Sequence, residues 1–321
     1  MNVLVSGGAG LIGSHLVDRL MAGGDRVTVV DDFSTGRRAN LEQLEQDERL
    51  RVVEADLTRD LPPALLAATY DRVYHLASPA SPPDFVRRPM ETLLVNSIGT
   101  RAMLDLARAG EGRFLLASTS EVYGDPLVHP QSEAYWGNVN PVGPRSCYDE
   151  AKRFAESMTM ALTRTSGIDA RIARIFNTYG PRSRPDDGRL IPSFCCQALA
   201  GEPMTIFGDG LQTRSFCYVT DLARGLVALM ETPGLAGEVV NLGNPREMTI
   251  LEVAEQVRAL TGTTSPLIRR PLPIDDPSRR QPDIAKARRL LGWEPEIDLD
   301  DGLRRTLEAF RQTVSAEPQL R

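Results

Sequence analysis

The sequence predicts an α/β fold: a Rossmann-type doubly wound parallel sheet with a smaller C-terminal substrate-binding lobe. Short apolar runs alternate with helical patterns through the first half of the 321-residue chain, which is typical of a parallel sheet with helices on both faces. After residue 176 the alternation loosens and the loops become proline-rich. We therefore assign residues 1–176 and about 215–243 to the sheet domain, and residues 177–214 and 244–321 to the lobe.

Composition and charge exclude several classes of protein. A formal net charge of −6 argues against nucleic acid as a main partner. No apolar run approaches the roughly 18 residues of a membrane span, and the chain opens on an apolar strand pattern without a leader, so we expect a cytoplasmic protein with no membrane partner. The four cysteines and three histidines show no metal-ligand spacing, so we expect reduced thiols and no metal.

A glycine-rich turn joins the first predicted strand, residues 1–5, to a helical pattern over residues 14–23. It reads S-G-G-A-G-L-I-G from Ser6 onward. Strand, glycine turn and helix in this order are typical of a dinucleotide-binding fingerprint, because glycines let backbone N–H groups approach a pyrophosphate at the helix N-terminus. We expect the cofactor to be held here by Gly7, Gly10, Leu11, Ile12 and Gly13.

Acidic residues follow the second predicted strand, residues 26–30. Asp31 or Asp32 can accept hydrogen bonds from both ribose hydroxyls of an adenosine, and a carboxylate there repels the 2′-phosphate of NADP. Arg37 and Arg38 follow closely and could pair with that phosphate, but we interpret them as solvated surface residues. The sequence therefore predicts a site for NAD.

Three further strands should deliver polar loops to the same edge of the sheet, where ligands bind in such folds. We expect strands over residues 51–54, 71–76 and 113–117. They lead to Asp56 and Leu57 near the adenine, to a proline-rich loop at 77–83, and to Ser118, Thr119, Ser120 and Glu121. A long helix over residues 90–109, apolar on more than one face, should pack against both the sheet and a partner.

Tyr148 and Lys152 stand four residues apart in a helical pattern over residues 148–164, so both side chains should lie on one face. A tyrosine phenol has an ordinary pKa of about 10, and an adjacent ammonium is expected to lower it, which makes Tyr148 a candidate general acid and base. Such a short motif often occurs by chance, and it gains weight from the cofactor site. Together they indicate hydride transfer to or from a carbinol carbon, with Thr119 or Ser120 bonding the reacting hydroxyl.

The second half should continue with strands at 170–176, 204–207 and 239–242 and helices at 191–200, 221–231 and 302–313. A capping box of Thr249 and Glu252 predicts one more helix, and the polar tail after residue 316 should fray. Guanidinium groups suit diphosphates because they bond bidentately and stay charged when desolvated. Although surface arginines are often only solvated, three are candidates for anionic parts of a substrate: Arg189, Arg214 and Arg280.

Motifs spread over nearly the whole chain carry a family resemblance. G-G-A-G-L-I-G, D-D-F-S-T-G, S-T-S-E-V-Y-G and Y-x-x-x-K resemble the extended short-chain dehydrogenases/reductases that modify nucleotide sugars. Other stretches are similar to the UDP-glucuronate decarboxylases, also called UDP-xylose synthases. They include H-L-A-S-P-A-S-P-P at 75–83, Y-W-G-N-V-N-P-V-G-P-R-S-C-Y-D-E-A-K-R at 135–153, R-I-F-N-T-Y-G-P-R at 174–182 and D-D-P-S-R-R-Q-P-D-I at 275–284.

The resemblance implies NAD as cofactor, a UDP-sugar as substrate and a homodimer formed through a pair of helices. Beyond the glycine turn, the residues implied to contact the cofactor are Asp31, Asp32, Ser34, Thr35, Gly36, Asp56, Leu57, Leu76, Ala77, Ser78, Asn96, Ser118, Tyr148 and Lys152. The implied catalytic residues are Thr119, Ser120, Glu121, Tyr148, Lys152 and Arg280. The implied substrate contacts are Pro79, Glu121, Asn177, Arg189, Arg214, Tyr218 and Arg280.

The resemblance also implies a reaction on UDP-glucuronate. Oxidation at C4 makes a ketone β to the carboxylate on C5, and loss of CO2 leaves an enolate at O4 that Tyr148 can stabilise. Re-reduction at C4 then gives UDP-xylose and regenerates NAD. Arg280 would orient the carboxylate, while Glu121 would steer a water or proton to C5 or disfavour the carboxylate in the ground state.

Several rival functions stay open at this point. The scaffold also suits a nucleotide-sugar 4-epimerase or 4,6-dehydratase, and the residue types allow a decarboxylase that releases the UDP-4-keto-pentose. A non-catalytic NAD-binding regulatory protein is more remote, because Tyr148, Lys152 and Thr119 are all present.

Three stretches depart from the usual motifs of the family. Asp32 and Ser34 replace an asparagine and a phenylalanine, Asp84-Phe85 replaces a common His-Tyr pair, and Arg184-Pro185 differs from the usual loop. These positions touch cofactor and sugar-edge contacts, so we expect them to affect substrate preference rather than the type of reaction.

Overall fold

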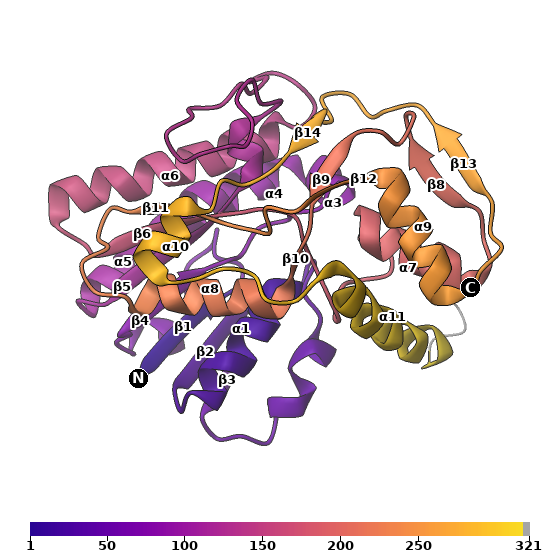
Figure 1. The fold of residues 1–321 in the computed structure, drawn as a ribbon. Coiled ribbons are helices and arrows are strands. Elements are labelled where there is room, and N and C mark those ends of the chain that lie inside the picture. The colour runs from indigo at the N-terminus through magenta and orange to yellow at the C-terminus, as the bar shows by residue number, and fades with distance from the viewer. Residues whose placement is uncertain (317–321) are drawn as a thin grey trace.

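A seven-stranded parallel sheet forms the centre of the molecule (Figure 1). The computed structural model describes residues 1–316, with side chains described through residue 312. The strand order is β11-β6-β5-β4-β1-β2-β3, and each neighbouring pair is parallel. The strands are β1 Asn2–Ser6, β2 Arg26–Asp31, β3 Leu50–Glu54, β4 Arg72–His75, β5 Arg113–Thr119, β6 Ala170–Ile175 and β11 Val239–Leu242. This order confirms the predicted Rossmann-type sheet.

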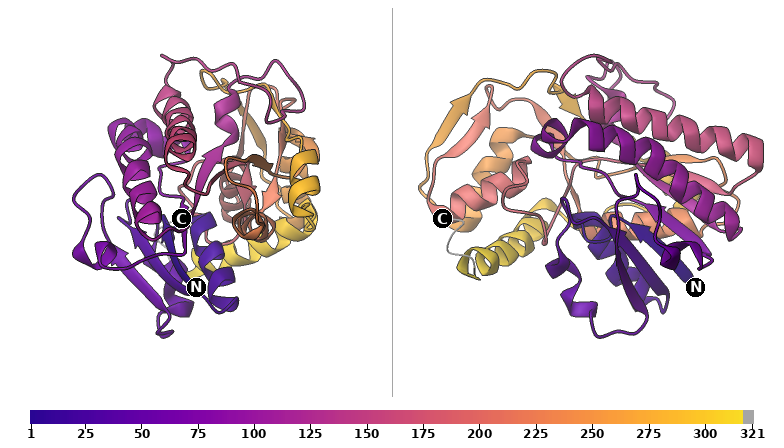
Figure 2. Two further views of the ribbon diagram at one scale, coloured as in Figure 1. Left: turned by 90° about the vertical axis from the view of Figure 1, so that its left-hand side faces the viewer. Right: turned by 180° about the vertical axis from the view of Figure 1, so that it is seen from behind.

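Helices cover both faces of the sheet because successive strand residues point to opposite sides. Val3 and Val5 belong to a core shared with α1 Leu11–Ala22 and α8 Val219–Glu231, whereas Leu4 between them belongs to a core shared with α5 Thr100–Ala109 and α6 Ser146–Ser166. The first pair of helices lies in front of the sheet in Figure 1, and the second pair comes to the front in the rear view of Figure 2.

A smaller lobe with its own apolar core lies beside the sheet. Its helices are α7 Leu190–Ala200, α9 Ile250–Thr261 and α11 Leu299–Ala316, and the predicted capping box of Thr249 and Glu252 begins α9. Its short strands are β8 Met204–Phe207 with β13 Leu267–Arg270, and β9 Thr213–Ser215 between β12 Glu247–Thr249 and β14 Arg279–Arg280. The boundaries that we assigned to the two parts of the chain stay a prediction.

Several shorter elements complete the fold. These are α2 Pro63–Leu66, α3 Pro82–Arg87, α4 Pro89–Leu94, α10 Ala285–Leu291, the 3-10 helices η1 Arg38–Leu44 and η3 Ser120–Tyr123, and the paired strands β7 Thr178–Tyr179 and β10 Cys217–Tyr218. None of the helices within residues 1–316 is both long and apolar enough to cross a membrane. The fraying predicted after residue 316 concerns residues outside the described part of the chain.

Two local predictions were wrong. The helix expected over residues 90–109 is interrupted, since α4 passes through a π-helical turn, η2 Val95–Gly99, before α5 begins. In that turn Asn96 donates from Nδ2 to Ser78 Oγ at 2.9 Å and to the Thr92 carbonyl at 2.8 Å. Pro82 and Pro83, expected within a loop, begin α3, because proline is tolerated in the first turn of a helix.

Candidate active site

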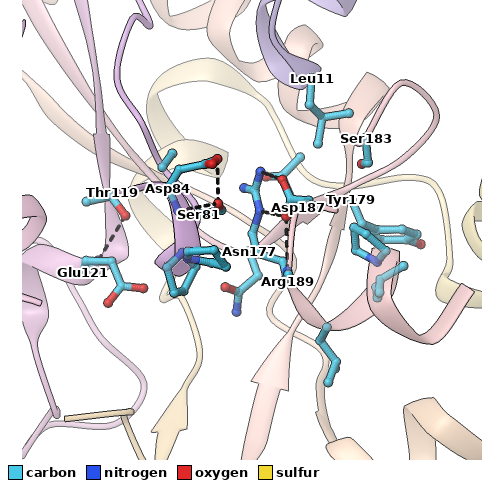
Figure 3. Close-up of a pocket in the computed structure, with 18 of the residues that line it drawn as sticks. Leu11, Ser81, Asp84, Thr119, Glu121, Asn177, Tyr179, Ser183, Asp187 and Arg189 are labelled. Carbon is cyan, nitrogen blue, oxygen red and sulfur yellow. Dashed lines mark hydrogen bonds and ion pairs between the residues drawn. The ribbon is translucent and has the colours of Figure 1, made fainter. Parts of the chain in front are cut away.

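One cavity of about 810 Å³ runs along the carboxyl edge of the sheet, between the sheet and the lobe (Figure 3). All six predicted catalytic residues line it, and so do eleven of the predicted cofactor contacts: Gly7, Gly10, Leu11, Ile12, Gly13, Thr35, Leu76, Ser78, Ser118, Tyr148 and Lys152. Among the predicted substrate contacts, Glu121, Asn177, Arg189, Arg214 and Arg280 line it. The fold therefore brings most of the predicted residues to a single cavity.

The glycine turn fits a dinucleotide. Gly7 has φ of +72°, and a Cβ on it would lie 2.7 Å from the Ala77 nitrogen, while a Cβ on Gly13 would lie 2.1 Å from the Gly7 oxygen. Side chains are therefore excluded, and the backbone itself faces the cavity. No side chain caps the N-terminus of α1, so its first N–H groups remain available for the diphosphate of NAD.

Asp31 lies at the end of β2, beside this turn. Its carboxylate accepts hydrogen bonds from the Ala9 and Phe33 N–H groups, both at 2.9 Å, and burial is the main cause that raises its pKa. Arg38 forms an ion pair with Glu54 and lies over the Phe33 ring, 4.2 Å from its centre. These contacts support our interpretation of Arg38 as a surface residue and fit NAD at the adenosine end.

Other predicted contacts do not line the cavity: Asp31, Asp32, Ser34, Gly36, Asp56, Leu57, Ala77, Asn96, Pro79 and Tyr218. Asn96 lies behind Ser78 and supports it, as described above. Tyr218 is buried in the core of the lobe, where its ring meets Tyr179 edge to face at 5.6 Å. For these residues a direct contact with cofactor or substrate stays a prediction.

Tyr148 and Lys152 lie on the first two turns of α6, and both are buried. The Lys152 ammonium donates to the Ala117 carbonyl on β5 at 2.9 Å and lies 5.9 Å from the centre of the Tyr148 ring. Tyr148 also stacks on Phe85 of α3, with ring centres 5.1 Å apart and planes 6° apart. This packing holds the phenol in one orientation at the cavity wall.

The protein alone does not lower the Tyr148 pKa as we expected. Burial raises the pKa of the phenol, against a smaller lowering from the Thr119 hydroxyl. Burial also lowers the pKa of Lys152 from 10.5 to about 7. Desolvation is the largest cause for both groups because both lie in a low-dielectric wall. The phenol is therefore protonated at neutral pH and ready to donate a hydrogen bond.

Glu121 lies just beyond β5, in η3, and joins two arginines. It forms a bidentate ion pair with Arg280, which is only 2% exposed, and accepts a hydrogen bond from Arg145 Nη2 at 2.9 Å. Burial acts to raise the pKa of Glu121, but the two guanidinium groups prevail and hold it below its ordinary value. Glu121 is thus an ionised carboxylate beside Thr119, whose hydroxyl accepts the Glu121 N–H at 3.2 Å.

The strand pairing of the lobe explains where the arginines lie. Arg280 on β14 stands opposite Arg214 on β9. Arg214 donates to Asp276 Oδ2 at 2.8 Å, and the other oxygen of Asp276 lies 3.7 Å from Arg145. Arg189 is chelated by Asp187 at 2.6 and 2.7 Å. The cavity therefore holds a cluster of guanidinium groups that suits a substrate with several anionic groups.

Asn177, after β6, offers a donor for a substrate. Its Nδ2 is buried and has no hydrogen-bond partner among the described residues, while the residue lines the cavity. An unpaired buried amide is costly, so a polar substrate group would complete it. Figure 3 shows Asn177 with Arg189, Asp187 and Glu121 around the cavity.

Sequence reasoning did not name Arg145 or Asp276 of this wall as site residues, and it noted Phe85 only as a departure from the family motif. Arg145 stands three residues before Tyr148, and its place one helical turn away was the signal that could have found it. Asp276 gave no such signal, because an acidic loop residue is usually structural.

Comparisons with known proteins agree with this geometry. The sequence model of the family described as GDP-mannose 4,6 dehydratase matches residues 4–306. UDP-glucuronic acid decarboxylase 1 of Xenopus tropicalis is 51% identical over 97% of this chain and 72% of its own length. UDP-glucuronic acid decarboxylase 4 of Arabidopsis thaliana is 52% identical over 98% of this chain and 69% of its own length.

The chain belongs to the family of UDP-glucuronic acid decarboxylases.

Solved structures of related enzymes share the fold. UDP-glucuronic acid 4-epimerase from Bacillus cereus, in complex with UDP-glucuronic acid and NAD, has a TM-score of 0.88 and 31% identity over 98% of this chain and all of its own. The dTDP-glucose 4,6-dehydratase of Streptomyces venezuelae, with NAD bound, has a TM-score of 0.89 and 32% identity over the full length of both chains. NAD is therefore the cofactor of this family member.

Proposed function

We propose that this protein converts UDP-glucuronate to UDP-xylose by NAD-dependent oxidation at C4, loss of CO2 and re-reduction. The observation that carries the proposal is the ionised Glu121, joined to Arg280 and Arg145 in the same cavity as Tyr148. An enzyme that acts on a neutral sugar has no carboxylate to orient. The decarboxylases that are about half identical to this chain support this choice over the epimerase and dehydratase, which are about a third identical.

Tyr148 performs the proton transfers at O4. When bound, NAD supplies the acceptor for the C4 hydride and later its return. In its phenolate form Tyr148 would take the proton of the C4 hydroxyl as C4 is oxidised, with Thr119 and Ser120 holding that oxygen. The phenol of the protein alone would lose its proton to reach this form when positive charge lies beside it, from the Lys152 ammonium and from the nicotinamide ring of bound NAD. The phenol then donates to O4 as the enolate forms, which stabilises its developing charge.

Arg280 and Glu121 act on the carboxylate. Arg280 orients it, and the C5–C6 bond breaks as its electrons enter the C4–C5 enolate and CO2 leaves. A proton delivered to C5, guided by Glu121, completes the exchange of carboxylate for hydrogen. Arg189, Arg214 and Asn177 bind the diphosphate and uridine portions. The net reaction consumes one proton and leaves NAD in its starting state.

The assembly is part of the proposal. Large apolar side chains of α4, η2 and α6 are exposed: Met90, Leu93, Leu94, Ile98 and Phe154. These elements contact one another, and Figure 2 shows α6 alongside the others in the rear view. An exposed apolar face on paired helices favours association with a second copy. We expect a homodimer, and four free cysteines fit a cytoplasmic location.

The experiment incubates the purified protein with UDP-glucuronate and trace NAD and identifies the product by mass spectrometry and NMR. UDP-xylose without net NADH is the expected result. UDP-galacturonate would establish an epimerase, a UDP-4-keto-pentose with stoichiometric NADH would establish the releasing decarboxylase, and unchanged substrate would refute the proposal.

A further inference from the structure

Two positions that depart from the usual family motifs contact each other in the structure. Arg184, between β7 and α7, donates from Nη2 to both carboxylate oxygens of Asp84 on α3, at 2.9 and 3.0 Å. Asp84 is held in turn by Ser81, whose hydroxyl donates to Oδ2 at 2.7 Å. Both side chains are mostly buried, 17% and 13% exposed, and both residues line the cavity. The pair is therefore a built contact rather than two solvated charges.

Arg184 also reaches the other side of the glycine turn. Its Nη1 lies 3.4 Å from the Thr35 carbonyl oxygen, which follows β2, whereas Asp84 follows β4. In the sheet β1 lies between β4 and β2, and β1 leads into the glycine turn. The Arg184 guanidinium group therefore contacts the segments that follow β4 and β2. These segments lie on either side of the glycine turn after β1, where the diphosphate of NAD is expected.

The residues around Arg184 are tied to the same region. Arg182 forms an ion pair of 2.7 Å with Asp18 of α1, and Gly188 approaches Pro83 of α3 so closely that a Cβ would lie 2.5 Å from its ring. Figure 3 includes Ser183 of this segment together with Leu11 of α1 and Asp84. We call residues 181–187 the strap. It is anchored to α1, α3 and the loop after β2.

We propose that the strap closes over the diphosphate of bound NAD and that the Asp84–Arg184 ion pair is its clasp, which must open before NAD leaves. The inference rests on the proposed function, since an enzyme that regenerates NAD within each turnover gains nothing from releasing it. A clasp can then slow NAD exchange without slowing turnover. Asp84 and Arg184 act here by closing the site, not by chemistry.

The test measures NAD dissociation directly. Full-length protein is loaded with labelled NAD, chased with unlabelled NAD, and sampled by rapid gel filtration. Asp84→Asn and Arg184→Gln are expected to release NAD about tenfold faster, as loss of a charged, mostly buried hydrogen-bonded pair implies. The charge-exchanged variant with Asp84→Arg and Arg184→Asp should recover part of the retention. Backbone amides of the strap should exchange hydrogen faster in both single variants.

Asp186→Asn is the matched control. Asp186 pairs with Nε of the same arginine at 3.1 Å but is 70% exposed, so its loss should leave NAD release unchanged. Equal release rates in wild type and Asp84→Asn would overturn the clasp. Slower release in Asp84→Asn would overturn it too, because the freed Arg184 would then be binding the diphosphate itself.

The outcome is separable from the proposed function. If Asp84→Asn fails to fold, Arg184→Gln decides, since it leaves Asp84 its Ser81 partner. If the wild-type protein makes UDP-xylose and the variants release NAD at the wild-type rate, only the clasp is refuted. If the wild-type protein makes no UDP-xylose but the Asp84 and Arg184 variants release NAD faster than it does, the proposed function is refuted and the clasp stands.

Discussion

Glu121 and Arg280 lie 159 residues apart in the chain and form a bidentate ion pair at the cavity wall. Arg280 is almost fully buried, and Arg145 shares the carboxylate. The contact joins the end of β5 to β14 of the lobe, so it links the chemistry at Tyr148 to the residues that hold the substrate. Such a pair adds little net stability when intact, but removing one partner strands a buried charge.

Glu121→Gln should therefore cost about 3 kcal/mol of unfolding free energy and strongly reduce CO2 release. The two guanidinium groups hold the Glu121 pKa below its ordinary value. The ionised carboxylate therefore stabilises the folded protein at pH values above its ordinary pKa, and this stabilisation is lost as pH falls through the lowered pKa. Urea unfolding should show that the difference in unfolding free energy between the wild type and Glu121→Gln is constant near neutral pH and disappears in acid. Glu54→Gln removes an exposed pair with Arg38 and should change neither quantity; a stable Glu121→Gln with full turnover would remove Glu121 from the mechanism.

Tyr148→Phe should reduce turnover by about a thousandfold, in the range expected for loss of a general acid and base. The fold should survive, because the ring keeps its stack on Phe85. NMR of the product mixture measures turnover and circular dichroism measures folding. Tyr70→Phe is the control, since that hydroxyl reaches the Leu65 carbonyl at 3.4 Å and Tyr70 does not line the cavity. Unimpaired turnover in Tyr148→Phe would contradict the assignment.

Lys152→Met should stabilise the protein without cofactor while abolishing most of its activity. Burial lowers the Lys152 pKa from 10.5 to about 7, so the unfolded chain binds more protons than the folded one between these values. Burial of the Lys152 ammonium therefore destabilises the folded wild-type protein most below pH 7. This destabilisation decreases as pH rises and vanishes above about 10.5. Thermal melts at several pH values should show that the unfolding free energy of Lys152→Met exceeds that of the wild type by about 1–3 kcal/mol at neutral pH. This difference should disappear at high pH. No gain at neutral pH would show that the ammonium is not desolvated.

Phe154→Glu should convert the expected homodimer to a monomer, because a charge placed on the apolar face of α6 must be desolvated at the interface. Phe154 is 51% exposed in the single chain, so its replacement should leave the fold intact. Light scattering after gel filtration gives the mass of each variant. Leu66→Glu, at an exposed apolar position on α2, should stay dimeric. A wild-type protein that is monomeric would contradict the proposed assembly.

The pattern of the sequence determined the sheet and the cofactor edge. Each predicted strand of the sheet lies within two residues of the strand observed, and the glycine turn follows β1 as expected, because strand periodicity and glycine spacing are local properties of the chain. One local error, at Pro82 and Pro83, arose because proline is tolerated in the first turn of a helix. The other arose where a tertiary contact accompanies a break in the helix. Asn96 supports Ser78 from within a π turn, and no periodic pattern over residues 90–109 announces that interruption.

Motifs and the family resemblance predicted that Tyr148, Lys152, Glu121 and Arg280 belong to one site. The spacing of these residues in the chain does not predict how each changes the pKa of the others. Only the tertiary structure buries Tyr148 and Lys152 enough to shift both pKa values against the simple expectation, brings Arg145 to Glu121, and pairs Asp84 with Arg184 across the glycine turn. Strand order follows from short-range patterns, whereas desolvation and ion pairing depend on which distant segments pack together. The fold and the class of chemistry can be read from local patterns of the chain, whereas the charges of the site depend on how the lobe packs against the sheet.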